Sequence, residues 1–268
     1  MKYDPVKKSI GNVVRDNAFL RVLFYKTLGL MFLREWHVKR ELRRLFHSYR
    51  LLRMLDAGCG FGQYSYFCAT RFSGINILAV DVIEDQIADC SSFFRKKNLA
   101  NVQFAVEDLS QSVHENEFDL VLSVDVMEHI EDDARVFRNF HRALKSGGTL
   151  LVNTPSNLGG SDVHTPEDES FVGEHARVGY GADEMRSKLE SVGFKIQKIK
   201  YTYGRAGTAA WRLGIKYPML ILNASKLFFL LLPFYYLTVL NAVLPLMYLD
   251  YVSTSKKGTG LLGVAKKL

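Results

Sequence analysis

The chain has 268 residues, 48% of them hydrophobic, which is enough to bury one substantial core but leaves room for only one or two domains. Its net charge of +7 is confined to the flanks, since residues 1–53 hold 13 lysines and arginines against four acidic residues and residues 195–268 hold 11 against one. An acidic middle between basic ends argues against an enzyme of nucleic acids, whose basic surface would surround its active site, and favours flanks that contact anionic lipid.

The beginning of the chain does not have the pattern of a secretory signal, because residues 1–8 include Asp4 and Pro5 and no apolar run. We therefore expect the protein on the cytoplasmic side of the membrane. Three cysteines are an odd number without the spacing of metal ligands. We expect no metal site and predict small, buried thiols in a reducing compartment at Cys59, Cys68 and Cys90.

Residues 18–36 combine apolar and basic side chains in the pattern of an amphipathic helix. The basic face continues beyond it through Lys39, Arg40, Arg43 and Arg44. A helix of this kind either anchors a protein in a membrane interface or packs as a cap over a binding site, and one helix can do both. We treat residues 1–50 as a basic, amphipathic N-terminal helical extension.

Short apolar runs alternate with helical patterns in the middle of the chain. Runs rich in valine, isoleucine and leucine predict strands at 51–57, 75–81, 102–106, 118–124 and 149–153. This alternation is typical of a parallel sheet that helices cover on both faces.

The helix after the fourth predicted strand has the clearest pattern. An acidic segment at 131–133 begins it, and Lys145 and Gly147 end it. Its apolar stripe consists of Val136, Phe137, Phe140 and Leu144. A further helix at 183–192 leads into a strand at 194–203.

A glycine-rich turn follows the first predicted strand and opens a helix, and its sequence is DAGCGFGQ, from Asp56 to Gln63. In this context the backbone of a turn can approach a ligand closely, and the helix N-terminus can face an anion. A dinucleotide-binding turn would need a glycine at position 63 and does not require an acidic residue at position 56. The turn therefore disfavours a nicotinamide cofactor.

Acidic residues follow at the ends of the next two predicted strands. A carboxylate about 20 residues after such a turn can accept hydrogen bonds from a ribose diol, and Asp81 stands 23 residues after Gly58. At the end of the third strand, Asp108 offers a carboxylate and Leu109 an apolar side chain where an adenine ring would lie.

Five segments, in this order, resemble those of class I S-adenosylmethionine-dependent methyltransferases: LDAGCGFG, Asp81, VEDL, FDLVLSVDVMEHI and LKSGGTLLVNTPSN. They lie between residue 54 and about residue 194, close to half of the chain, and are most similar to the ubiquinone and menaquinone methyltransferase branch. The resemblance implies a Rossmann-like α/β fold, a parallel sheet with an antiparallel last strand, and S-adenosyl-L-methionine as cofactor. It is much less specific for the methyl acceptor.

The resemblance also implies a cofactor-binding set, which comprises Asp56, Gly58, Gly60, Gly62, Asp81, Val82, Asp108, Leu109 and Ser123. The three glycines are expected to approach the methionine part, Asp81 the ribose, and Asp108 and Leu109 the adenine. Asp56 is expected to order the turn or to meet the amino group through water.

A hydroxyl acceptor needs a base as well as alignment with the methyl group. Candidates follow the fourth and fifth predicted strands: Asp125, Glu128, His129, His164, Glu174, His175 and Tyr180. We expect His129, Glu128 and His175 to be catalytic. His129 is the leading base, because open sheets place ligands beyond the carboxyl ends of strands, and anchoring its own loop is the alternative role. Residues 154–181 are too long for a simple connection and are a candidate lid.

The last apolar segment carries no charged residue in 23 positions, from 227 to 249, and is long enough to be a membrane-spanning candidate. Pro233 and Pro245 interrupt it, and its ends carry interfacial rings at Tyr235, Tyr236 and Tyr248. A buried helical subdomain or a dimer surface is the alternative.

The resemblance implies a sixth strand at 194–203 and an antiparallel seventh at 259–265. The methyltransferase domain then comprises residues 51–203 and 259–268, and residues 204–258 are an apolar, membrane-associating insertion. Since both ends of the insertion return to one sheet, we expect it to dip into the bilayer and come back, or to lie in the interface, with breaks near the prolines.

These features predict a monotopic methyltransferase that acts at a membrane surface on an apolar or lipid-like acceptor, with transfer to oxygen. A cytosolic small-molecule methyltransferase that uses the insertion as a homodimer surface is the first alternative. A non-catalytic, membrane-bound protein that keeps the cofactor site is the second. We expect no nucleic acid among the partners.

Overall fold

The computed structural model describes residues 17–46, 52–159, 176–224 and 226–268. Its helices and strands follow the chain in this order: α2 (Ala18–Met31), α3 (Leu33–Phe46), β1 (Leu52–Ala57), α4 (Gln63–Arg71), β2 (Ile75–Asp81), α5 (Glu84–Lys96), β3 (Val102–Val106), β4 (Phe118–Val124), η1 (Met127–His129), α6 (Asp133–Ala143), β5 (Leu144–Pro155), α7 (Ala182–Ser191), β6 (Phe194–Thr202), α8 (Arg205–Trp211), η3 (Arg212–Lys216), α9 (Tyr217–Ala224), η4 (Lys226–Leu231), α10 (Leu232–Val252) and β7 (Gly260–Lys267).

Seven strands form one sheet in the order β3-β2-β1-β4-β5-β7-β6. The neighbours from β3 to β5 are parallel, and β7 pairs antiparallel with both β5 and β6. This confirms the Rossmann-like sheet with an antiparallel last strand. The predicted strands at 75–81, 102–106 and 118–124 coincide with β2, β3 and β4. Strand β5 begins five residues before its predicted start, because Leu144 pairs with Phe118 across an irregularity in the register.

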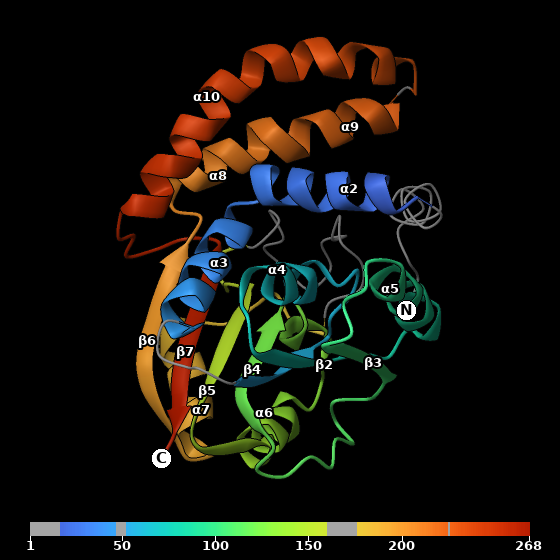
Figure 1. The fold of residues 1–268 in the computed structure, drawn as a ribbon. Coiled ribbons are helices and arrows are strands. Elements are labelled where there is room, and N and C mark those ends of the chain that lie inside the picture. The colour runs from blue at the N-terminus through green and yellow to red at the C-terminus, as the bar shows by residue number, and fades with distance from the viewer. Residues whose placement is uncertain (1–16, 47–51, 160–175, 225) are drawn as a thin grey trace.

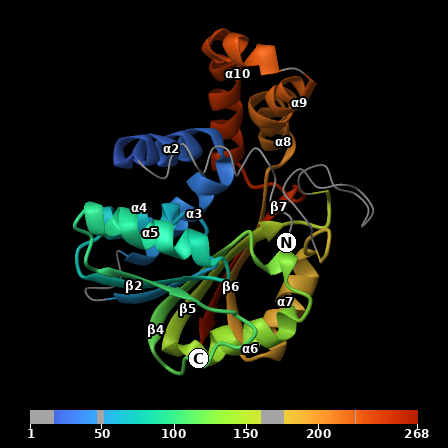
Figure 2. The ribbon, with the colours of Figure 1, turned by 90° about the vertical axis from the view of Figure 1, so that its right-hand side faces the viewer.

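Helices cover both faces of the sheet (Figure 2). On one face, α3, α4 and α5 bury Val38, Cys68 and Phe94 in a shared apolar cluster with β1 and β2. On the other face, α6 and α7 bury their apolar stripes against β4 and β5. Helix α6 buries three of the four predicted stripe positions, Val136, Phe137 and Phe140, and it ends at Ala143, so Leu144 is buried as the first residue of β5 and not as part of the helix. Asp132 caps the start of α6 by accepting a hydrogen bond from the Arg135 amide at 3.1 Å. The three cysteines are buried and free, as the sequence predicted.

The N-terminal segment forms two helices rather than the single helix predicted at 18–36. Helix α2 ends at Phe32, whose backbone is extended, and α3 begins at the next residue. The indole of Trp36 donates a hydrogen bond to the Gly29 carbonyl at 2.8 Å, so a side chain from α3 satisfies an end group of α2. The break lets α3 pack on the sheet while α2 extends beyond it (Figure 2).

The segment between β6 and β7 forms a helical hairpin. Helices α8, η3 and α9 lead away from the sheet, and η4 and α10 return to it (Figure 1). The hydroxyls of Tyr235 and Tyr236 on α10 donate to the carbonyls of Leu213 and Gly214 in the π-helical turn η3, at 2.7 and 2.9 Å. Pro233 lies in the first turn of α10, whereas Pro245 lies inside it without ending it, so a break at that proline is wrong.

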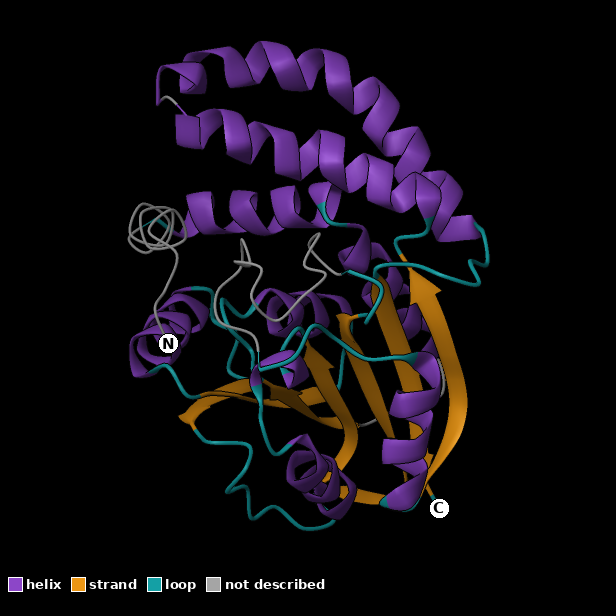
Figure 3. Ribbon diagram, turned by 180° about the vertical axis from the view of Figure 1, so that it is seen from behind, coloured by secondary structure: helices purple, strands orange, loops and turns teal. Residues whose placement is uncertain are grey.

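The root of the hairpin is fixed to α3. Leu33 of α3 packs with Ala210 of α8 and with Val243 and Met247 of α10. Asp250, at the end of α10, accepts a hydrogen bond from the Gly207 amide at 3.2 Å. As a result, α2 and the hairpin lie together beyond the end of the sheet to which β4, β5 and β6 point (Figures 1 and 3).

Candidate active site

The glycine-rich turn lies between β1 and α4, and each of its three glycines has a positive φ: 79° at Gly58, 51° at Gly60 and 75° at Gly62. Side chains rarely adopt this region, so the turn depends on glycine. A Cβ atom at Gly58 would lie 2.3 Å from Val126, whereas a Cβ atom at Gly60 would meet nothing within 4 Å. The space over Gly60 is therefore open, as a turn that contacts a ligand requires.

Asp81 holds this turn from the end of β2. One carboxylate oxygen accepts a hydrogen bond from the Gly60 amide at 2.9 Å, and the other accepts one from the Ile83 amide at 3.1 Å. A carboxylate oxygen has two acceptor positions, so Asp81 retains capacity for a diol. Asp81, the residue predicted to bind the ribose, thus lies beside the open face of Gly60.

Asp56 is buried at the end of β1. The Ser65 hydroxyl donates to its carboxylate at 2.6 Å, which ties the turn to α4. Burial raises the pKa of Asp56 to about 6, and the hydrogen bond from Ser65 opposes that shift. These contacts favour the first of its two expected roles, which is to order the turn.

The residues expected around the adenine lie at the ends of β2 and β3. Val82 is 56% exposed, whereas Leu109 is buried in the cluster under β4 and α6. Asp108 accepts hydrogen bonds from the Ser110 amide at 2.8 Å and from Gln111 at 3.2 Å, and these contacts lower its pKa. Asp108 therefore shapes the loop, and Val82 offers an apolar side chain at this edge.

Buried polar atoms at the same edge of the sheet suit a polar ligand. Within the described part of the chain, no hydrogen-bond partner reaches Gln63 Oε1, Ser123 Oγ or Asn153 Oδ1. Buried polar groups are nearly always paired, so these three atoms indicate space for ligand or water. The open turn, Asp81 and these atoms together fit S-adenosylmethionine.

Helix α2 contacts the glycine turn directly. The guanidinium of Arg21 and the hydroxyl of Tyr25 both donate to the carbonyl of Phe61, the former at 3.0 Å. Arg21 also forms an ion pair with Asp89 of α5 at 2.6 Å. Helix α2 therefore packs beside the glycine turn, as a cap over the binding site would require.

Helix α3 supplies a site residue that sequence reasoning missed. Arg34 forms an ion pair with Asp125, the residue that follows β4, and Asn153 of β5 donates to the same carboxylate at 3.2 Å. Asp125 has a positive φ of 53°, which these contacts stabilise. An arginine in a basic helix 91 residues away carries no sequence signal for this pairing.

Glu128 and His129 lie in the short helix η1, beyond the end of β4. Glu128 is buried, its carboxylate accepts from the Thr154 hydroxyl at 3.2 Å, and its carbonyl accepts from the Ala176 amide at 2.9 Å. Burial, and after it the nearby Asp125 carboxylate, raises the pKa of Glu128 to about 8. His129 is partly exposed, which leaves it the more accessible of the two to an acceptor.

The remaining base candidates separate into two groups. His164, Glu174 and His175 lie outside the described residues, as does most of the candidate lid. Tyr180 is fully buried, and its hydroxyl donates to Asp133 at 2.7 Å on the side of α6. Tyr180 therefore joins η1 to the core and does not face the glycine turn.

The sheet order and the site define a class I, Rossmann-like methyltransferase domain. The sequence family described as a methyltransferase domain matches residues 49–203, and the chain belongs to that family. S-adenosylmethionine is its cofactor. The family match does not distinguish the ubiquinone and menaquinone branch, which the sequence resembles, from other branches of this class.

Two curated proteins and one solved structure illustrate the likeness. The chain is 30% identical over 149 residues to phosphoethanolamine N-methyltransferase 1 of Triticum aestivum, a match that covers 53% of this chain and 28% of that protein. It is 28% identical over 156 residues to malonyl-[acyl-carrier protein] O-methyltransferase of Bacillus anthracis, covering 56% and 57%. The structure of Haemonchus contortus phosphoethanolamine N-methyltransferase 2 with S-adenosyl-L-methionine has a TM-score of 0.58 and 21% identity, covering 87% of this chain and 52% of that one.

The matches cover 57% of the malonyl-[acyl-carrier protein] O-methyltransferase and smaller shares of the other two proteins. Their names cover transfer to nitrogen and to oxygen. The likeness therefore defines the domain and its cofactor, and the acceptor has to be inferred from this chain's own residues.

Proposed function

We propose that the protein transfers a methyl group from S-adenosylmethionine to an oxygen of a lipid-like or aromatic apolar acceptor at the cytoplasmic surface of a membrane. Lipid or quinone biosynthesis, the setting of the branch that the sequence resembles, suits such an acceptor. One observation carries the proposal: helices α2, α9 and α10 lie beyond the ends of the strands that hold the cofactor residues (Figure 1), and these helices carry exposed apolar side chains.

The exposed apolar surface is concentrated on α2, α9, η4 and α10. Phe234 and Leu237 on α10 are 69% and 75% exposed, and Phe19 on α2 is 72% exposed. The helical stretch Phe228–Val252 has a mean hydropathy of 1.8, and only 6% of its most apolar window is buried. A core helix of that composition would be mostly buried, and large exposed apolar patches are typical of membrane or protein contacts.

Strand pairing argues against a single membrane crossing. Helix α10 is long enough to span a bilayer, but β6 and β7 at the two ends of the insertion pair along their whole length, from Phe194 with Lys267 to Thr202 with Gly260. Both ends of the hairpin are therefore on one side. This geometry supports a monotopic attachment in which the hairpin enters one leaflet and returns.

The basic flanks support an anionic leaflet in part. Lys256 and Lys257 are exposed where the hairpin returns to the sheet. In contrast, two residues of the basic face predicted on α3 are used inside the protein, since Lys39 pairs with Glu35 and Arg40 donates to the Tyr251 carbonyl. The electrostatic contribution therefore comes from the root of the hairpin and from Arg43 and Arg44, which remain exposed on α3.

The chain's own residues would position the acceptor and move its proton. Bound at this edge, S-adenosylmethionine supplies an electrophilic methyl group on a sulfonium centre. Asp81 and the glycine turn would hold the cofactor, and Arg21 and Tyr25 of α2 would keep that turn in place through the Phe61 carbonyl. His129 would accept the hydroxyl proton of the acceptor, and the buried Glu128 would position η1 through Thr154.

Vesicle binding tests the membrane proposal. The double variant Phe234→Glu/Leu237→Glu is expected to reduce cosedimentation with phosphatidylcholine–phosphatidylglycerol vesicles by at least about tenfold, because each buried apolar side chain of this size contributes about 1.5–3 kcal/mol. The control is Val113→Glu/Leu268→Glu, which places the same charges at exposed apolar positions on loops or chain ends away from the hairpin.

Equal cosedimentation of the wild-type protein and the hairpin variant would contradict the proposal. Light scattering without lipid distinguishes the dimer alternative. If the wild-type protein does not cosediment with vesicles and is a dimer, whereas the hairpin variant is a monomer, the apolar surface is a subunit interface instead.

A further inference from the structure

A cleft of about 630 Å³ lies at the root of the hairpin, between α8 and the turns that follow β5 and β6. One face of the α8–η3–α9 stretch lines it, with Arg205, Thr208, Arg212 and Tyr217 at helical spacing. The opposite face of the same stretch packs Gly207 and Ala210 against α3 and α10. The cleft is therefore built on a helix that is fixed to the core.

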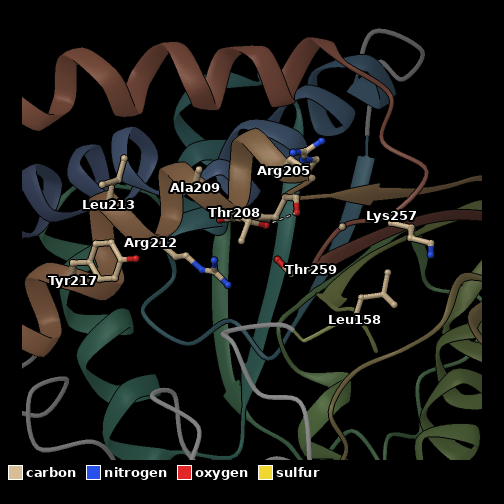
Figure 4. A pocket seen from close by; sticks show the side chains of 12 residues that line it. Leu158, Arg205, Thr208, Ala209, Arg212, Leu213, Tyr217, Lys257 and Thr259 are labelled. Carbon is tan, nitrogen blue, oxygen red and sulfur yellow. Dashed lines mark hydrogen bonds between the residues drawn. The ribbon is translucent and has the colours of Figure 1, made fainter.

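The described residues that line the cleft include three basic side chains, Arg205, Arg212 and Lys257, and none of these described lining residues is acidic. In Figure 4 the side chains of Arg212 and Lys257 extend from opposite sides of the cleft. The neighbouring cleft of about 420 Å³ differs, because it also contains Asp250. The larger cleft thus suits an anion better than the smaller one does.

Apolar side chains connect this cleft with the proposed membrane surface. Leu213 and Tyr217 lie beside Arg212, and Leu158 lies below Lys257 (Figure 4). Tyr217 is also one of the exposed large side chains of α9, together with Leu220 and Ile221. An amphiphile with its tail along α9 would therefore place its head group in the cleft.

The inner wall of the cleft is linked to the end of β4, where η1 carries the proposed base. Tyr203 lines the cleft, and its hydroxyl accepts a hydrogen bond from the Arg34 amide at 3.1 Å. The guanidinium of Arg34 in turn pairs with Asp125, three residues before Glu128. A molecule held in the cleft would thus extend toward the end of β4, where η1 begins.

We propose that this cleft binds a phosphate group of the methyl acceptor, with Arg212 and Lys257 as its main ligands. This inference rests on the proposed function and narrows its substrate class to acceptors that carry both a phosphate and an apolar part. Three cations match the double charge of a phosphate better than the single charge of a carboxylate. Arginine and lysine form charge-assisted hydrogen bonds with phosphate oxygens, and the Thr208 and Thr259 hydroxyls line the same space.

Calorimetry with the full chain tests this site, and the probes are dihexanoylphosphatidic acid, the neutral dihexanoylglycerol and inorganic phosphate. The wild-type protein is expected to bind the lipid phosphate more tightly than the other two. The variant Arg212→Gln/Lys257→Gln is expected to lose at least about tenfold in affinity for it, since two charged contacts are removed. The charge-matched control is Arg138→Gln/Lys195→Gln, which changes exposed residues on α6 and β6.

Unchanged affinity in the cleft variant, or equally tight binding of dihexanoylglycerol, would overturn the proposal. Tight binding of inorganic phosphate that requires Arg212 and Lys257 would support the phosphate site but overturn a lipid source. Retained affinity for S-adenosylhomocysteine shows that the cleft variant is folded. If the wild-type protein fails to bind vesicles but still binds a phosphate in the cleft, the membrane proposal fails and the site stands.

Discussion

Gly60→Arg is expected to abolish binding of S-adenosylhomocysteine, and Asp81→Ala is expected to weaken it at least about tenfold. The arginine side chain would occupy the open space over the turn, where a Cβ atom meets nothing within 4 Å. Asp81→Ala removes both the expected ribose ligand and the acceptor that orders the Gly60 amide. Calorimetry on folded variants measures both effects.

Matched controls separate loss of the ligand site from loss of the fold. Gly147 also has a positive φ, 78°, and only the Lys266 side chain lies near its Cβ position, so Gly147→Arg introduces comparable backbone strain near the start of β5. Asp119→Ala removes another carboxylate that accepts from a backbone amide, that of Arg53 at 2.8 Å. Both controls should bind S-adenosylhomocysteine like the wild-type protein. Unchanged affinity in Gly60→Arg and Asp81→Ala would end the assignment of this cofactor site.

His129→Ala is expected to lower turnover by about 10²- to 10⁴-fold while leaving the affinity for S-adenosylhomocysteine unchanged, because a base acts on the acceptor and not on cofactor binding. The partly exposed His129 lies beyond the end of β4, whereas Glu128 beside it is buried. The measurement is the initial rate of label transfer from S-adenosylmethionine to a membrane lipid extract.

The control for this variant is His141→Ala. His141 lies in the last turn of α6, with its ring against Phe194, and takes no part in the site. Turnover of His129→Ala within a few-fold of the wild-type rate would reject His129 as the base. Such a result would leave its loop-anchoring role and would suit an acceptor that needs no proton transfer.

The sheet and the glycine turn could be predicted because their signals are local. Strands of a parallel sheet are buried on both faces and appear as continuous apolar runs, so the bounds of β2, β3 and β4 follow from the sequence. The positive φ values of Gly58, Gly60 and Gly62 could be predicted because this kind of turn requires positive φ at its glycines, and glycine adopts that conformation without steric cost. The α6 stripe is equally local, because Val136, Phe137 and Phe140 at helical spacing face one core, whereas Leu144 follows the helix as the first residue of β5.

Contacts between distant segments could not be predicted in the same way. The ion pair of Arg34 with Asp125 and the donation from Arg21 to the Phe61 carbonyl depend on where α2 and α3 pack, and an arginine in a basic amphipathic segment gives no sign of its partner. The break at Phe32 lacks a proline or an adjacent glycine, and it is stabilised by Trp36 of the next helix. Burial of the Tyr180 hydroxyl also follows from tertiary packing, since the sequence shows only a tyrosine in a long loop.

The proposed function requires that this domain methylate a component of the membrane that its apolar helices contact. The most direct measurement incubates the purified protein with vesicles made from a cellular lipid extract and S-adenosylmethionine that carries a deuterated methyl group, and then analyses vesicles and supernatant by mass spectrometry. A lipid product that carries the labelled methyl group is expected in the vesicle fraction, and it should be absent with Gly60→Arg. Label that appears only in water-soluble products would contradict the proposed function.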